Sequence, residues 1–84
     1  LGVFATVANG ATSVIQHNNR TPLTGNGGTN TTGGITLGAD SGTPSAGTFW
    51  NGAIKEVIEY GAAHDAATRR QVINYLGQVG NISV

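Results

Sequence analysis

Residues 3–17 hold two short runs whose side chains divide between two faces with a period of two, which predicts two short antiparallel strands. The run from Val3 to Val7 is followed by Asn9-Gly10, residue types that supply the two positive-φ positions of a type I′ hairpin turn. The return run from Ala11 to His17 alternates in the same way, as expected of a half-buried antiparallel strand. Asn18-Asn19 then predicts a second tight turn.

The middle of the chain is polar and rich in turn residues. Arg20 to Gly34 consists almost wholly of Thr, Gly, Asn and Pro, which predicts an exposed loop with room for one short edge strand. Ile35 to Ala39 reads as a short strand because Ile35 and Leu37 share one face. Asp40 to Pro44 consists of residue types that favour turns, and we expect a second polar loop from Asp40 to Thr48.

The last third of the chain predicts a long strand and then a helix. Phe49 to Tyr60 is the longest strand candidate, and its register of Ile54, Ile58 and Tyr60 is expected to face the core. Asp65 stands where an N-cap belongs, and the following apolar residues recur at helical spacing up to Val79. We therefore predict strands within about 1–60 and an amphipathic helix over about 65–79, with Gly80-Asn81 as its end.

Length and composition allow one partial domain over residues 1–84. With 84 residues, 14 of them Gly, 38% hydrophobic and 10% charged, the chain fits a mainly β protein with many turns. Ordering a residue costs ~1.5 kcal/mol, and these few short elements bury too little apolar area to offset that cost alone. We expect a second set of strands to complete the fold. Because the chain opens at Leu1 directly in a strand-like run, we also expect it to be a piece of a longer chain.

Charge and apolar content argue against two classes of partner. Four basic and four acidic residues cancel, and no Lys/Arg cluster offers a field for a phosphate backbone, so we expect no nucleic acid. No apolar run approaches the ~20 residues that span a bilayer, so we expect no membrane. Without Cys, neither a disulfide framework nor a thiolate metal site is available.

The order of these motifs resembles the C-terminal part of a concanavalin A-like lectin/glucanase domain of the laminin-G-like type. The resemblance rests on Val7 to Gly10, on Gly34 to Ala39, on Phe49 to Tyr60 and on the helix that ends Tyr75-Leu76. It implies a partial antiparallel β-sandwich, or jelly roll, that closes with an α-helix. Domains of this type occur in phage tail and capsid-associated proteins and in bacterial surface proteins, which implies a virion or an extracellular or cell-surface location.

Glu56 is the first candidate for a special role. It shares the register of Ile54 and Ile58, which aims an ionisable group toward the core, where an unpaired charge is costly. Arg69 or Arg70 on the closing helix would make it a structural ion pair. Catalysis is the alternative, because family members that hydrolyse glycans use paired carboxylates. Glu56 and Glu59 fall on opposite faces of a strand and would not act on one bond.

Trp50, Asn19 and Asn51 form the tentative ligand-binding set. The flat face of Trp50 would stack on a sugar ring while the asparagines exchange hydrogen bonds with its hydroxyls. The alternative for Trp50 is a packing role at the end of the sandwich. Asp40 is a weak calcium candidate, since some family relatives bind Ca²⁺ at loop rims, and a plain turn residue is the alternative. We otherwise expect no cofactor and no metal.

Three functions remain open at this point. The first is a non-catalytic, lectin-like binding module that attaches through its polar loops to glycans or to other virion or surface proteins. The second is a purely structural capsid or tail decoration subunit, completed by missing N-terminal strands or by a neighbouring chain and open to homo-oligomerisation. The third is a fragment of a glycoside hydrolase. We expect no enzyme, because only one inward carboxylate is evident.

Overall fold

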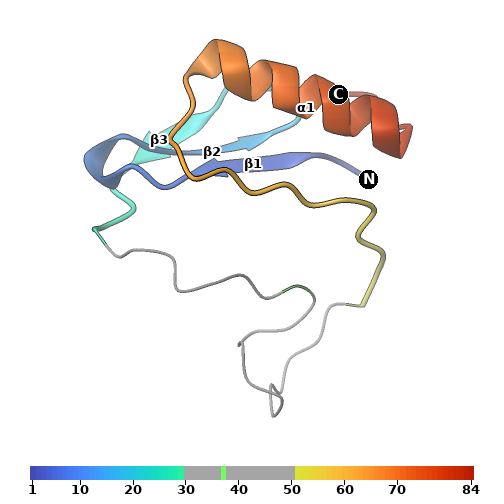
Figure 1. The fold of residues 1–84 in the computed structure, drawn as a ribbon, viewed down its shortest axis with the longest axis horizontal. Helices are drawn as coiled ribbons and strands as arrows, with labels where there is room; N and C mark the ends of the chain where they lie inside the picture. The colour runs from blue at the N-terminus through green and yellow to red at the C-terminus, as the bar shows by residue number, and fades with distance from the viewer. Residues whose placement is uncertain (30–36, 38–50) are drawn as a thin grey trace.

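A computed structural model describes residues 1–29, 37 and 51–84, which form a three-stranded antiparallel sheet and a C-terminal helix. The strands are β1 (Phe4–Val7), β2 (Ser13–His17) and β3 (Leu23–Gly25), in that spatial order. The helix α1 (Ala66–Gly80) lies across one face of the sheet, giving two layers (Figure 1). Short antiparallel strands first and a closing helix last agree with the sequence-based prediction.

The first hairpin forms, but its connection differs from the predicted turn. Strands β1 and β2 pair along the whole of β1. Asn9 has a φ of −147°, so only Gly10, at 55°, has the positive φ that a type I′ turn requires at both positions. The chain instead makes a short 3-10 helix, η1 (Gly10–Thr12). The Asn9 amide donates to Thr12 Oγ1 at 2.8 Å and Ser13 Oγ donates to the Gly10 carbonyl at 2.8 Å, and these local bonds stabilise the longer loop.

The second turn and the edge strand are confirmed. Asn18 has a φ of 52°, a value that Asn tolerates better than most residues. Its backbone N–H donates to the Val3 carbonyl at 2.8 Å, and its side-chain Oδ1 accepts from the Val3 N–H at 2.8 Å. Strand β3 lies within the segment predicted as a loop with one edge strand, and it pairs with β2 in antiparallel register.

Both ends of α1 are capped by side-chain and backbone groups. The Asp65 carboxylate accepts from the Thr68 N–H at 2.8 Å, as predicted for the N-cap. At the other end Asn81 adopts the left-handed conformation, with a φ of 55°. Ile82 N–H donates to the Gly77 carbonyl at 2.7 Å, which is the long-range bond of a Schellman motif. The predicted end at Gly80-Asn81 is confirmed.

The residues after α1 fold back onto the molecule because the helix has a glycine, Gly77, where the tail passes. A Cβ at Gly77 would come within 2.8 Å of Val84 Cγ1 and 3.0 Å of the Ile82 carbonyl oxygen. The Val84 carbonyl in turn accepts from the Asn19 N–H at 3.1 Å. Gly77 therefore lets the C-terminal tail pass close to the helix and reach the turn that follows β2.

The two faces of the sheet differ sharply in burial. On the face covered by α1, Val3 is 5% exposed and packs in the same layer as Ile73, which is fully buried at 0%. On the opposite face Phe4, Ile15 and Leu23 are 69%, 50% and 72% exposed. The registers place Leu23 opposite Ile15, so the apolar side chains on this second face are neighbours across the sheet. We call it the open face.

The long strand predicted over Phe49 to Tyr60 does not form in its described part. Residues 51–60 carry no strand, and Ile54 and Tyr60 are exposed rather than in the core. Alternation alone does not make a strand, because a strand requires a neighbour with which to exchange backbone hydrogen bonds. The segment instead runs extended beside β1 (Figure 1). It is held near the end of α1 by Lys55, whose Nζ donates to the Gly80 carbonyl at 2.6 Å.

One further strand prediction falls largely outside the described residues. Of the predicted strand from Ile35 to Ala39 only Leu37 is described, and it stands in a bend with an exposed side chain.

Candidate functional site

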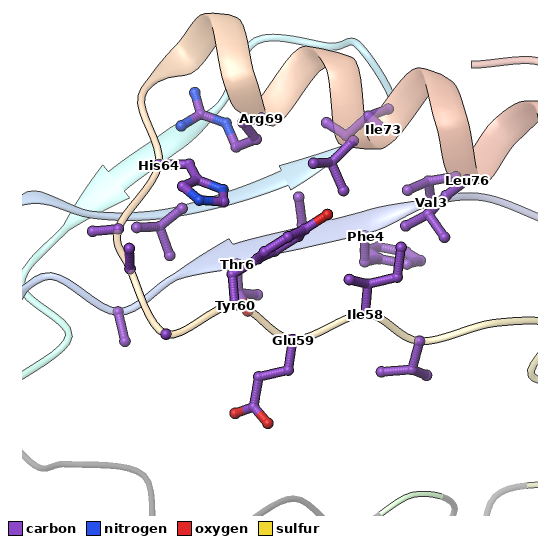
Figure 2. A pocket seen from close by; sticks show the side chains of 18 residues that line it. Val3, Phe4, Thr6, Ile58, Glu59, Tyr60, His64, Arg69, Ile73 and Leu76 are labelled. Atoms are coloured by element: carbon purple, nitrogen blue, oxygen red, sulfur yellow. The ribbon is translucent and has the colours of Figure 1, made fainter.

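A groove of about 830 Å³ lies between β1, the extended segment and α1 (Figure 2). Residues 3–8 form one wall and residues 57–64 form the other. The helix contributes Arg69, Val72, Ile73 and Leu76. We call this feature the β1 groove.

The apolar lining of the β1 groove follows from two periodicities. Val72, Ile73 and Leu76 recur at three- and four-residue spacing and lie on one side of α1. Val3, directly before β1, continues the alternation of the strand, so its side chain points to the covered face and meets that helical stripe. Figure 2 shows Val3, Ile73 and Leu76 approaching one another at one end of the groove. This contact positions the helix over the sheet.

The other end of the groove carries its polar and aromatic groups. The rings of Tyr60 and His64 lie 4.6 Å apart between centroids and are tilted by 56°. Arg69 lies beside them, and its Nε donates to Gln16 Oε1 at 2.7 Å (Figure 2). That bond links α1 to β2 across the covered face of the sheet. The alternation of the sequence places Gln16 on this face, but it does not reveal Arg69 as its partner.

The predicted tie between Glu56 and the helix rests on a premise that is wrong. The side chain of Glu56 is exposed and lies on a segment that is not a strand, so it does not face the core. Arg69 directs its Nε to Gln16 instead, and Arg70 is exposed. A pairing of Glu56 with Arg69 or Arg70 stays a prediction. The argument that Glu56 and Glu59 fall on opposite faces of one strand no longer applies, because both are exposed on an extended segment.

The tentative sugar-binding residues are placed only in part. Asn19 lies in the turn after β2, and its Nδ2 donates to Asn74 Oδ1 on α1 at 2.8 Å. Its Oδ1 is buried without a hydrogen-bond partner among the described residues. Asn51 is exposed. Trp50 and the calcium candidate Asp40 lie outside the described residues. The placement therefore gives Asn19 a structural contact and leaves the ligand-binding role of all three residues as a prediction.

Within the described ranges, the ionisable side chains do not gather as metal ligands would. No group of three or more His, Cys, Asp or Glu side chains in residues 1–29, 37 and 51–84 lies close enough to hold an ion. One pKa is clearly displaced. The backbone and side-chain hydrogen bonds from Thr68 hold the pKa of Asp65 below its ordinary value of 3.8, and His64 and Arg69 add a smaller effect in the same direction.

The described residues hold no helix with the length and the apolar content to cross a bilayer.

Sequence reasoning missed the β1 groove because its walls belong to three segments that are far apart in the chain. The one signal available was the stripe of Val72 and Leu76, which indicates a buried helix face but not its partner. Comparison with known proteins adds no family: no family model, no curated protein and no solved structure matches the chain.

Proposed function

We propose that this chain is part of a concanavalin A-like β-sandwich and serves as a non-catalytic binding and structural module in which a second β layer covers the open face. One observation carries the proposal, namely the exposed apolar row formed by Phe4, Ile15 and Leu23. Apolar side chains grouped in this way are typical of a surface that is covered in the working assembly. The second layer comes from another segment or another chain.

The small extent of the buried layer supports the same conclusion. Among the described residues, Val3 and Ile73 are the buried hydrophobic side chains, whereas Ile54, Val57 and Tyr75 are exposed. Fully burying one such side chain contributes roughly 1.5–3 kcal/mol, and ordering each residue costs a comparable amount. If a second β layer packed against the open face, the apolar side chains of that face would become part of the core of a sandwich.

A dye-binding and association experiment tests the second layer. The 84-residue chain alone is expected to bind the fluorescent probe ANS and to unfold with poor cooperativity or to self-associate. The variant Ile15→Thr/Leu23→Thr places threonine, which is favoured in strands, at both positions and removes two apolar side chains from the open face. Its ANS fluorescence is expected to be lower than that of the wild-type chain, while its helical circular dichroism signal persists. A monomeric wild-type chain that unfolds cooperatively and binds no ANS overturns the proposal.

The attachment role is proposed for the polar loop after β2. The described part of that loop after β3, residues 26–29, is exposed, and Asn26 bonds only locally, accepting from the Gly28 N–H at 2.9 Å. Exposed Asn and Thr on a sheet scaffold leave hydrogen-bonding groups free for glycan hydroxyls or for protein surfaces on a virion or cell. A glycan array of the 84-residue chain, repeated with Trp50→Ala, tests the lectin form. Absence of sugar binding by both proteins would leave the structural form.

A further inference from the structure

The outer edge of β1 carries backbone groups that point away from the sheet. Asn18 N–H donates to the Val3 carbonyl, and these residues continue the β1–β2 register. In an antiparallel ladder, such hydrogen-bonded pairs alternate with pairs whose backbone groups face outward. Phe4 and Thr6 are therefore the strand residues whose N–H and C=O point away from β2. Outside the ladder, the hydrogen bonds between described residues do not involve these groups.

These outward groups lie along the β1 groove. Phe4 and Thr6 belong to the wall formed by β1, and the extended segment that carries Ile58 and Tyr60 forms the facing wall (Figure 2). Leu76 of α1 contributes an apolar side chain to the same groove. An unpaired sheet edge beside an apolar groove combines backbone donors and acceptors with a hydrophobic contact surface, which is how strand addition binds an extended peptide.

Charge defines the occupant of the groove. The ionisable side chains in its lining are Glu59, Tyr60, His64 and Arg69, and Glu59 points out of the groove (Figure 2). Arg69 is already bonded to Gln16. The remaining side chains are apolar apart from the hydroxyl of Thr6, so a net charge on the occupant would lose hydration without gaining a partner. The groove is matched to an uncharged segment.

The facing wall also limits the occupant to one strand. A second copy of this chain would approach β1 with its whole sheet and helix, and the segment around Val57 and Tyr60 stands in the way of that approach. A single extended segment would lie with β1 on one side and residues 57–64 on the other.

We propose that the β1 groove binds one extended, uncharged segment of another polypeptide chain, which adds to the sheet as a strand next to β1. This inference rests on the proposed function, in which a β element from outside completes the fold, and it names the β1 edge as one place where such an element joins the sheet. The backbone groups of Phe4 and Thr6 form the new ladder bonds, and alternate apolar side chains of the segment pack toward Leu76.

A peptide titration tests the groove. The probe is a synthetic acetylated octapeptide alternating threonine and valine, added to the ¹⁵N-labelled 84-residue chain. Binding is expected to slow hydrogen exchange at the Phe4 and Thr6 amides and to shift the resonances of Val57 and Leu76. A titration without added protection at the Phe4 and Thr6 amides overturns the proposal.

Two proline variants separate the edges of the sheet. Thr6→Pro removes an outward N–H from β1, and proline is tolerated at such edge positions. Thr24→Pro is the matched control at the opposite edge of the sheet. The backbone groups of Val14 point toward β1, so its partner Thr24 in β3 does not bond to them, and the N–H of Thr24 points away from β2. Thr6→Pro is expected to weaken peptide binding about tenfold or more, whereas Thr24→Pro leaves it unchanged. Equal binding by the two variants contradicts the proposal.

A variant that leaves the backbone intact provides the second measurement. Val57 is exposed and lines the facing wall, so Val57→Glu places a charge in the groove without removing a buried side chain. It is expected to weaken the peptide at least tenfold while the circular dichroism spectrum stays unchanged, and unaltered binding contradicts the proposal. Ile15→Thr/Leu23→Thr changes the open face only and is expected to bind normally. Its ANS result therefore reports on the second layer, and the peptide result reports on the groove.

Discussion

Two adjacent residues at the N-terminal end of the sheet, one just before β1 and one at its start, differ sharply in burial because they point to different faces of the sheet. Val3 is 5% exposed and Phe4 is 69% exposed, although both are large apolar side chains one position apart. The strand sends them to opposite faces, and only one face is covered by α1. Burial here is decided by what lies over a face and not by the residue type. The covered face should therefore be sensitive to substitution and the open face tolerant.

Truncating Ile73 should produce the largest loss. Its side chain is fully buried between α1 and the sheet, so Ile73→Ala is expected to cost about 2–5 kcal/mol, enough to unfold a chain with so small a core. Ile15→Ala removes the same atoms from the open face and is expected to cost well under half as much, because that side chain is already half exposed. The helical circular dichroism that each variant keeps under the same conditions compares the two losses. Similar losses for the two variants would mean that the open face is buried in solution.

The C-terminal tail offers a sharper test of the covered side. Gly77→Ala favours the helix by about 1 kcal/mol in propensity, but the new Cβ would stand 3.0 Å from the Ile82 carbonyl oxygen and closer to Val84. The tail is therefore expected to detach, with fast hydrogen exchange at the Asn19 amide and a net loss of about 1 kcal/mol. Gly61→Ala is the control, since a Cβ there meets nothing within 4 Å. A more stable Gly77→Ala protein that keeps the Asn19 amide protected would contradict this account.

The polar link across the covered face should matter less than its apolar core. Arg69 Nε and Gln16 Oε1 are 2.7 Å apart in a partly buried setting. A hydrogen bond to a charged group contributes roughly 1.5–3 kcal/mol, and solvent screening reduces that contribution for a partly exposed pair. A double-mutant cycle with Gln16→Ala and Arg69→Ala isolates the coupling. Its expected value is about 1 kcal/mol. A coupling near zero would show that these side chains do not hold helix and sheet together.

The sequence predicts local features of this chain well, and its failures concern partners. The cap at Asp65, the helix end at Gly80-Asn81 and the turn at Asn18 are governed by a few neighbouring residues, and all are confirmed. The strand predicted to end at Tyr60 fails in its described part, because the pattern cannot specify which backbone would pair with it. The predicted type I′ turn at Asn9 is wrong, because the chain forms a short 3-10 helix there in which the Asn9 side-chain amide donates to Thr12 Oγ1.

The candidate site follows the same division. Arg69 is correctly placed on a helix by its periodicity, and the pairing of Glu56 with Arg69 or Arg70 stays a prediction. The bond from Arg69 to Gln16 that the structure shows was not expected from the sequence. The two residues of that bond are 53 positions apart, and no spacing rule connects a strand position with a helix position at that separation. The β1 groove is missed for the same reason. Trp50 stays a prediction, because it lies outside the described residues.

The smallest expected effect is a pH dependence at the start of α1, and its sign follows from the cap. The Thr68 N–H favours the charged form of Asp65, so its pKa in the folded chain lies below the ordinary 3.8. A group whose folded pKa is lowered contributes its stabilisation above 3.8 and loses it as the pH falls through the folded value. Helical ellipticity should therefore decline below pH 3.8. Asp65→Asn keeps a side-chain oxygen for the cap but cannot titrate there, so its decline should be shallower. Because the other carboxyl groups titrate in both proteins, the difference between the two curves isolates the cap, and identical curves would show that the Asp65 charge does not stabilise the covered face's helix.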